Sequence, residues 1–356
     1  MSEPTNESAR PPINTSRLAI TILVVLAAAG GAYWFGVNSI QPKKVAALWA
    51  LGMDRPSSEQ LDSKFQDADD NLIADPPVNR ADWLDPPTLN FSYLAAEQER
   101  SAATWADVLK FISERCGKPV EFRPQDSPDK QLAGIRSGEL HIIGINSGAV
   151  PVAVNQCGFV PLCSFGADGK LAPYTMKIIA RKDSPLTNVG DLKGHRLALT
   201  DPTSNSGWKA PLFLLKTEYR LTPIVDYDIV STHGHANSIR AIAAGEQEVA
   251  AVASDELQLG EAHGLIKADD YRVIYESKPF CNNTIGCPHN LNPDLVKKVK
   301  QALLEYGWKG SKLEEELSPI GAKQFVAVSF KDDFGLLREI DDAMGRRTRE
   351  MLGRQF

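Results

Sequence analysis

The sequence lacks the features that mark several large classes of protein. It has no long cluster of lysine or arginine, and its 39 Lys+Arg against 45 Asp+Glu leave a net charge of -6. Nucleic-acid-binding proteins need a basic surface for the phosphate backbone, so that class is excluded. Only one long apolar run occurs, which excludes a transporter with many membrane spans. Proline (23 residues) and glycine (26) are near average, which excludes collagen-like and wholly disordered chains.

The usual signatures of catalysis are also absent. The chain contains no G-x-S-x-G nucleophile turn, no H-E-x-x-H zinc motif and no glycine-rich dinucleotide loop. We therefore expect neither an enzyme nor a cofactor. What remains is a chain of 356 residues, 43% of them hydrophobic and 24% charged, which suffices for two ordinary domains and additional segments.

The single apolar run covers residues 18–37, twenty positions without a charge. About 20 apolar residues allow a helix to cross a bilayer, so we predict a retained membrane anchor with residues 1–17 on the cytoplasmic side. A cleaved signal peptide is the alternative, because Ala27-Ala28-Ala29 offers an A-x-A cleavage site. No cysteine follows closely, which excludes a lipoprotein anchor. Both alternatives place the remainder outside the cytoplasmic membrane, in the periplasm.

The five cysteines fit an exported protein in two ways. Cys157 with Cys163, and Cys281 with Cys287, are each six residues apart and can close small disulfide loops in an oxidising compartment. Cys116 is left over. The alternative is that all five are buried thiols. A zinc site is disfavoured, because neither pair has the two-to-four residue gap of structural zinc sites.

Residues 38–87 are rich in proline and aspartate and only weakly periodic, which predicts a stalk between the membrane and the folded part. Within it, four oxygen-bearing side chains occupy positions 1, 3, 5 and 9 of a possible calcium loop, namely Asp67, Asp69, Asn71 and Asp75. Position 6 is Leu72 where calcium loops have glycine, and position 12 is Val78 where they have glutamate. A solvated acidic linker is therefore favoured over a calcium site.

From about residue 88 onward, short strand and helix patterns alternate. Two segments share one design: IRSGELHIIGINS and IAAGEQEVAAVAS each pass from a helix end through glycine and an acidic residue into an apolar strand that ends in small polar residues. This correspondence predicts an α/β protein with two similar lobes. Ligands of open α/β sheets bind beyond the carboxyl ends of the strands, so a cleft is expected between the two polar rims.

The strongest local signal is HRLALTDPTSNSGW, in which a strand runs into a polar loop and a helix begins at once. Unpaired N–H groups at a helix start, its positive dipole end and nearby hydroxyls can together hold an anion. One residue would suffice for an ordinary N-cap, whereas this loop supplies Thr203, Ser204, Asn205 and Ser206. We therefore predict an anion-binding loop. It is not a P-loop, because the required Gly-x4-Gly-Lys spacing is absent.

Other strand ends supply further candidates. His235 follows the strand before STHGHANSI, where its ring could donate to a bound oxyanion or simply cap a helix or fill the core. Asp255 follows EVAAVAS and could accept from a protonated ligand or merely cap the next helix. Asn146 and Ser147 end the corresponding strand of the first half.

Two catalytic alternatives use the same part of the sequence. Ser204 or Ser206 could be combined with His235 and Asp255 as a hydrolytic triad, but the sequence supplies no oxyanion or base geometry. His233 and His235 could ligate zinc if a third ligand approached, but no such motif is adjacent. Binding is therefore favoured over catalysis.

These segments resemble the phosphonate/phosphite-type periplasmic solute-binding proteins of ABC importers, within the type II periplasmic-binding-protein superfamily. The likeness extends over about residues 88–345, carried by LNFSYL, RSGELHIIGINSGAV, KIIARKDSPLTNVGDLKGHRLALTDPTSNSGW, GHANSIRAIAAGEQEVAAVASDEL and YRVIYESKPFCNNTIGCPHNLNPDLVKKVKQAL. The DPTSNSG loop is similar to the family loop that holds the phosphonate head group, and His235 and Asp255 match a family histidine and acidic residue. Tyr93 falls near the family's first-lobe aromatic contact, and Asn146 and Ser147 where its first-lobe rim reaches the ligand.

The resemblance implies a two-lobe type II fold, with lobe 1 at residues 88–175 and 285–356 and lobe 2 at 176–284. It implies that hinge closure traps a small phosphorus oxyanion (phosphonate, phosphite or phosphate) in the cleft, and that a membrane ABC permease reads the closed form. Two departures matter. Ala236 stands where the family often has an acidic residue, and Asn146-Ser147-Gly148 replaces an aromatic–Gly–Pro rim. An oxyanion is therefore favoured over an ammonium-bearing ligand.

Three alternatives remain open at this stage. One is an exported receptor for another anion, such as a sulfonate, that serves a signalling partner. Another is a serine- or zinc-dependent hydrolase. The last is a structural protein of the cell envelope with a vestigial cleft.

Overall fold

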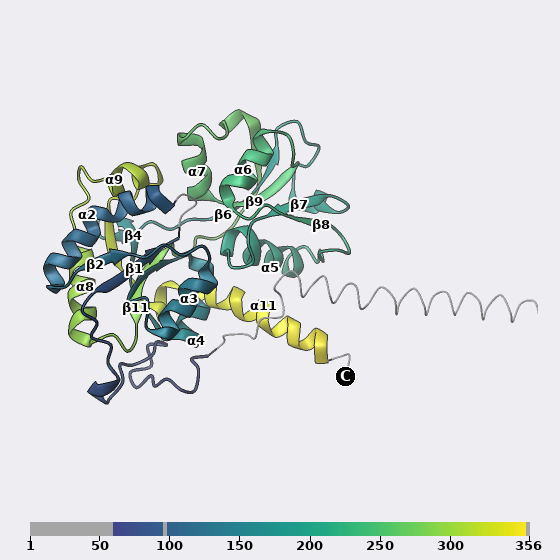
Figure 1. Ribbon diagram of the computed structural model, residues 1–356. Helices are drawn as coiled ribbons and strands as arrows, with labels where there is room; N and C mark the ends of the chain where they lie inside the picture. Colours follow the sequence, from purple (N-terminus) through teal and green to yellow (C-terminus); the bar gives the residue numbers. More distant parts are fainter. Residues whose placement is uncertain (1–59, 95–97, 354–356) are drawn as a thin grey trace, which may run out of the picture. The chain divides into compact units, whose positions relative to one another are not determined.

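Two separate sheets carry the described part of the chain, which comprises residues 60–94 and 98–353 of this computed structural model (Figure 1). The first sheet has seven strands in the order β12-β4-β11-β3-β1-β2, with β5 beside β4, and the second has five in the order β10-β6-β9-β7-β8. The predicted α/β class is confirmed. The predicted anchor at 18–37 lies outside the described residues, and none of the helices within them is long and apolar enough to span a bilayer.

The first sheet takes its strands from two stretches of the chain. β3 pairs in parallel with β1, which pairs in parallel with β2, whereas β11 runs antiparallel to both β3 and β4. All four residues of β3 are buried, as expected for an apolar strand covered on both faces. The strands are β1 (Leu89–Tyr93), β2 (Val120–Phe122), β3 (Ile142–Ile145), β4 (Phe159–Ala167), β5 (Lys170–Leu171), β11 (Thr284–Pro288) and β12 (Gln324–Ala327).

The second sheet comes from one intervening stretch. β7 pairs in parallel with β8 and β9, and β6 runs antiparallel to β9 and β10. Every residue of β9 is buried, so this strand lies at the centre of its layer. The strands are β6 (Met176–Arg181), β7 (Arg196–Leu199), β8 (Asp228–Ser231), β9 (Val249–Ala253) and β10 (Tyr271–Glu276).

Helices cover both faces of each sheet (Figure 1). α2, α8 and α9 share an apolar cluster with the first sheet that includes Trp105, Val299 and Phe325, and α3 and α4 lie on the other face. α6 and α7 share a second cluster with β6, β7 and β9, and α5 lies on the other face of that sheet. The helices are α2 (Gln98–Cys116), α3 (Pro128–Ser137), α4 (Val150–Cys157), α5 (Ala210–Thr217), α6 (His235–Ala243), α7 (Ser254–Ala262), α8 (Pro293–Glu305), α9 (Lys312–Leu317), α10 (Phe330–Asp333) and α11 (Gly335–Gly353).

The two segments of matching sequence have matching structure. Gly138 ends α3 with φ 74°, and Gly245 follows α6 with φ 75°, a backbone conformation that glycine adopts at little cost. β3 and β9 follow these glycines, and each is buried throughout. Each sheet with its helices is called a lobe below: lobe 1 contains β1–β5, β11 and β12, and lobe 2 contains β6–β10.

Two crossovers join the lobes, at residues 172–175 and 277–283. They lie side by side, because Tyr174 and Phe280 exchange backbone hydrogen bonds of 3.1 and 2.7 Å and their rings are 5.6 Å apart. Paired crossovers of this kind allow two lobes to rotate about one shared line.

The described part of the predicted stalk, residues 60–87, lies against lobe 1. The backbone N–H of Asp62 donates to Asn155 in α4 at 2.8 Å, the Phe65 ring packs edge-on against His289 at 4.7 Å, and Leu84 donates to Asn290 at 2.7 Å. These contacts use the backbone and isolated side chains, so they leave no periodic pattern in the sequence. Residues 60–87 therefore pack against lobe 1, while 38–59 lie outside the described residues, and the stalk stays a prediction.

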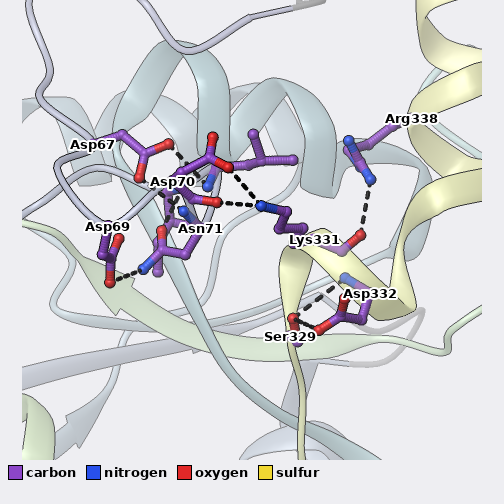
Figure 2. Close-up of polar contacts among 10 residues, drawn as sticks. Asp67, Asp69, Asp70, Asn71, Ser329, Lys331, Asp332 and Arg338 are labelled. Atoms are coloured by element: carbon purple, nitrogen blue, oxygen red, sulfur yellow. Dashed lines mark hydrogen bonds and ion pairs between the residues drawn. The ribbon is translucent and has the colours of Figure 1, made fainter.

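The candidate calcium ligands bond to their own loop instead (Figure 2). Asp67 accepts two backbone N–H groups at 2.9 and 3.0 Å, Asp75 accepts one at 2.7 Å, and the Asn71 amide donates to Asp69 at 2.8 Å. No group of three or more acidic, histidine or cysteine residues in the described part of the chain could hold a metal ion. The calcium alternative therefore has no structural support.

All five cysteines are free and buried. Burial raises the pKa of each thiol, which favours the neutral S–H form. The structure therefore favours buried thiols over the two disulfide loops.

Candidate functional site

The predicted anion-binding loop leads into a single π-helical turn, residues Asn205–Lys209, that continues as α5. Ser204 caps this turn: its Oγ accepts the backbone N–H of Gly207 at 3.1 Å. The side chain of Asn205 and that of Ser206 are buried directly behind the cap. π-Helical turns are rare and concentrate at functional sites, so the turn sets this loop apart from an ordinary helix start.

Lobe 1 meets this loop through the short helix η2 (Ser147–Ala149). A Cβ atom on Gly148 would lie 2.3 Å from the carbonyl oxygen of Thr203 and 2.5 Å from the backbone nitrogen of Asn205. Such distances are far below any normal contact, so only glycine lets the two backbones approach this closely. The polar rims that the sequence places on two different strands are therefore in direct contact.

Tyr174 joins the two rims at the crossover. Its hydroxyl lies 2.5 Å from Oγ of Ser147 in lobe 1 and accepts the Asn205 amide N–H of lobe 2 at 3.1 Å. Burial raises the pKa of Tyr174, so the phenol remains neutral. The sequence gives no signal for Tyr174, because an isolated tyrosine before a strand carries no motif.

His235 begins α6 with both ring nitrogens engaged. Nδ1 accepts the backbone N–H of Ala253 at 3.2 Å, and Nε2 lies 3.2 Å from Oγ of Ser204. Burial lowers its pKa to about 4, against an opposing effect of Asp201, so the ring is neutral at physiological pH. Because Nδ1 accepts a hydrogen bond, the proton of the neutral ring sits on Nε2 and points at Ser204.

This tautomer decides what Ser204 can do. Oγ of Ser204 accepts from both Gly207 and His235, so its own O–H is available to donate to a ligand. A catalytic base would need a bare Nε2 and a proton on Nδ1, which would then oppose the N–H of Ala253. The residues are adjacent, yet the geometry is that of a donor relay from His235 through Ser204 and not of a nucleophile and its base.

Asp255 and Tyr93 are anchored by the second crossover. Asn282 donates to Asp255 at 2.9 Å, and the neighbouring Asn283 donates to the hydroxyl of Tyr93 at 2.9 Å. Burial raises the pKa of Tyr93, which therefore remains neutral. The triad drawn from the sequence is thus not formed, since Asp255 is held by Asn282 and the Nδ1 partner of His235 is Ala253.

Glu256, next to Asp255, is a second carboxylic acid at the site. Glu256 donates its backbone N–H to Asp255 at 2.9 Å, and its pKa is raised to about 7 by burial and by the charges of Asp255 and Glu316. Burial also raises the pKa of Asp255. Glu316 belongs to α9 of lobe 1, so carboxyl groups of both lobes gather here.

Two predicted site residues have local roles. Thr203 bonds to Asp201 through both its N–H at 2.8 Å and its hydroxyl at 2.5 Å, which shapes the loop. The Asn146 side chain accepts the N–H of Ala149 at 3.0 Å and caps η2. His233 is exposed and lies 3.4 Å from Ser231, so it does not join His235 at a common centre.

Known proteins share this architecture. The chain is 25% identical to the phosphonates-binding periplasmic protein of Escherichia coli (strain K12) over 227 residues, which is 62% of this chain and 66%, just under two thirds, of that protein. PhnD1 of Prochlorococcus marinus in complex with methylphosphonate has a TM-score of 0.62 at 14% identity, over 75% of this chain and 100% of that one. A binding-protein component of the Pseudomonas aeruginosa ABC phosphonate transporter has a TM-score of 0.60 at 18% identity, over 76% and 100%.

The structural likenesses confirm the two-lobe type II periplasmic-binding-protein fold. The family described as "ABC transporter, phosphonate, periplasmic substrate-binding protein" matches residues 91–334, which contain both sheets except the first two residues of β1, and every candidate site residue from Tyr93 to Asp255. This chain belongs to that family of periplasmic substrate-binding proteins.

Proposed function

We propose that this protein captures a small phosphorus oxyanion, namely a phosphonate, phosphite or phosphate, and delivers it to an ABC importer. The observation that carries the proposal is the donor relay at the start of the π-turn, in which neutral His235 Nε2–H donates to Ser204 Oγ and leaves Ser204 O–H to donate to a ligand. Because the neutral ring needs no protonation to donate, His235 holds Ser204 in this orientation over the whole physiological pH range.

Binding would proceed by rotation of the lobes about the paired crossovers. The oxyanion would accept hydrogen bonds from Ser204 and Ser206 of lobe 2 and from the Ser147 rim of lobe 1, while His235 acts by holding Ser204. Closure of a cleft between the lobes excludes water, which strengthens each of these charge-assisted bonds. No covalent bond is formed or broken, and the closed form is what a membrane permease would recognise.

The setting of this activity is part of the proposal. The folded part lies in the periplasm, with lobe 1 at residues 88–175 and 285–356 and lobe 2 at 176–284. Residues 18–37 either anchor it to the cytoplasmic membrane or are removed as a signal peptide. A tether on the N-terminal side would hold lobe 1, because residues 62–85 bond to that lobe.

Two matched serine substitutions test the proposal. Ser204→Ala removes the π-turn cap and the proposed ligand donor, whereas Ser311→Ala removes the cap of α9, where Ser311 accepts Glu314 N–H at 3.2 Å, and a hydrogen bond to Tyr306, both away from the anion-binding loop. Each loss of a cap costs about 1 kcal/mol of stability. Calorimetric titration with methylphosphonate, phosphite and phosphate should show binding by the wild type and Ser311→Ala and a large loss of affinity in Ser204→Ala.

Two other results of the wild-type titration would favour the alternative functions. Wild-type protein that binds a small alkanesulfonate and no phosphorus oxyanion would transfer the proposal to the sulfonate alternative. Wild-type protein, freed of carried-over ligand, that binds none of these anions would contradict the proposal outright and support the structural alternative.

A further inference from the structure

Lys209 connects the anion-binding loop to η2 of lobe 1 and to α11, a helix that packs against both lobes. It is the last residue of the π-turn capped by Ser204. Its ammonium donates to the carbonyl oxygen of Gly148 at 2.7 Å and to Oδ1 of Asp341 in α11 at 2.5 Å. The side chain of Lys209 is 14% exposed and that of Asp341 10%, which makes this the most buried ion pair between described residues.

Burial of two opposite charges is an expensive way to gain stability. The loss of hydration offsets most of the attraction, and an apolar pair of similar size often stabilises a fold as well or better. Ion pairs of this kind are more informative about geometry, because each charge requires its partner at one place. Lys209 requires two partners at once: Gly148 belongs to the opposite lobe, and Asp341 belongs to α11, which packs against both lobes.

The lobe 1 side of this contact is itself fixed. Arg338, three residues before Asp341 in α11, donates to the carbonyl oxygen of Lys331 at 2.8 Å, and the Lys331 ammonium holds Asp70 at 2.7 Å (Figure 2). Gly148 meets the loop at Thr203 without room for a side chain. The contact therefore joins the anion-binding loop to a surface that other hydrogen bonds already hold in place.

We propose that Lys209 is a positioning residue for anion binding. By pairing with Asp341 and Gly148 it holds the Ser204 loop against the Ser147 rim, and so sets the separation of the donors that the two lobes present to the oxyanion. This inference rests on the proposed function. It adds a residue that touches no ligand atom and acts through the relative position of the two loops.

Lys209→Met tests the proposal by removing the charge while keeping most of the side chain's length. With methylphosphonate as the probe in stopped-flow binding, the dissociation rate should rise by about 30-fold or more while the association rate stays nearly constant, as is usual when a buried charge pair is broken. Spin labels placed on exposed positions of the two lobes should report a longer or broader distance distribution in the ligand-free variant than in the ligand-free wild type. Asp341→Asn should act in the same direction, and the double variant should fall well short of the sum, since both changes remove one contact.

Lys118→Met is the matched control, because Lys118 likewise donates to a backbone carbonyl (Pro86, 2.7 Å) and pairs with an aspartate (Asp85, 2.9 Å), and neither partner belongs to the other lobe. It should leave the dissociation rate and the distance distribution unchanged. Lys209→Met or Asp341→Asn with wild-type dissociation and distances would overturn the proposal, and the second variant answers the question if the first does not fold. If wild-type protein binds no anion but Lys209→Met still alters the distances, the proposed function fails and the contact between the lobes stands.

Discussion

Gly148→Ala is the sharpest test of the contact between the two rims. The added Cβ would lie 2.3 Å from Thr203 O, 2.5 Å from Asn205 N and 2.9 Å from the carbonyl carbon of Ser204. All three are backbone atoms of the anion-binding loop, so no side chain can swing aside. Gly148 does not have the positive φ that favours glycine, so the substitution tests space alone.

The size of the effect follows from this geometry. Ordinary contacts begin near 3.4 Å, so the two backbones must separate by about 1 Å to admit the methyl group. Overpacking of this kind costs about 1–3 kcal/mol. Because 1.4 kcal/mol is a factor of ten, the closed arrangement should become about 5- to 150-fold less favourable, and oxyanion affinity should fall by a similar factor.

Thermal unfolding and calorimetric titration measure the two consequences. Gly148→Ala should unfold at a temperature a few degrees below the wild type and bind methylphosphonate more weakly. The control is Gly307→Ala, at a position where nothing lies within 4 Å and φ is not positive. Wild-type unfolding and affinity in Gly148→Ala would refute the argument that the rims touch through this glycine.

Two further predictions concern buried titratable groups. Because the pKa of His235 falls to about 4 in the folded state, the unfolded chain takes up a proton first as the pH drops. The contribution of His235 is therefore complete above pH ~6.5 and up to about 3 kcal/mol of it is lost as the pH approaches 4. Urea unfolding at several pH values should show a shallower loss in His235→Gln, and an identical loss would contradict the buried neutral ring. The five buried thiols should resist a thiol reagent in the native protein and all react after unfolding without reductant. Three or one reactive thiols would restore the disulfide alternative.

Much of the fold is predictable because its elements carry local patterns. The alternating apolar and polar residues of 89–94 and the helical spacing of 101–117 correspond to β1 and α2. The two glycines recur at matching places in the sequence, and this repeat predicts two similar lobes. In the structure both glycines lie at helix ends with nearly equal φ, 74° at Gly138 and 75° at Gly245. Such signals arise within a few residues of chain, where spacing and backbone conformation determine one another.

Residues 60–87 show the limit of this approach. Their proline and aspartate content indicates a linker, yet they lie against lobe 1 through backbone hydrogen bonds such as Leu84 to Asn290 and single contacts such as Phe65 to His289. Neither kind of contact is periodic. Asp67 and Asp75 likewise match a calcium pattern by spacing while their oxygens accept the N–H groups of their own loop.

Local sequence patterns predict some residues of the candidate site and miss others. Ser204 and His235 follow strands and precede helices, so their proximity of 3.2 Å could be anticipated. Tyr174 and Asn282 lie on crossovers, and their hydrogen-bond partners are distant in sequence, so no local sequence pattern predicts them. The choice between binding and hydrolysis depends on the N–H of Ala253, a backbone atom that no side-chain motif records.

The charge of the site also depends on more than one position. Residue 236, directly after His235, is an alanine and carries no charge, which from sequence favours a site poor in carboxylates. Folding instead gathers Asp255, Glu256 and Glu316, and Asp255 is close enough that its charge adds to burial in raising the pKa of Tyr174. An anion near these groups is favoured only while the buried acids hold protons.

Oxyanion affinity should therefore fall as the pH rises through about 7, where Glu256 loses its proton. Even at about 10 Å and an effective dielectric constant of about 20, one new negative charge repels an anion by about 1.7 kcal/mol, on the order of tenfold in affinity. Glu256→Gln keeps a neutral side chain at every pH and should remove this fall. The ratio of wild-type to Glu256→Gln dissociation constants, measured with methylphosphonate from pH 5.5 to 8.5, cancels the ligand's own titration. A ratio that stays constant over this range would show that Glu256 does not act on the anion, and the proton on Glu256 would then serve only the packing of α7 against lobe 1.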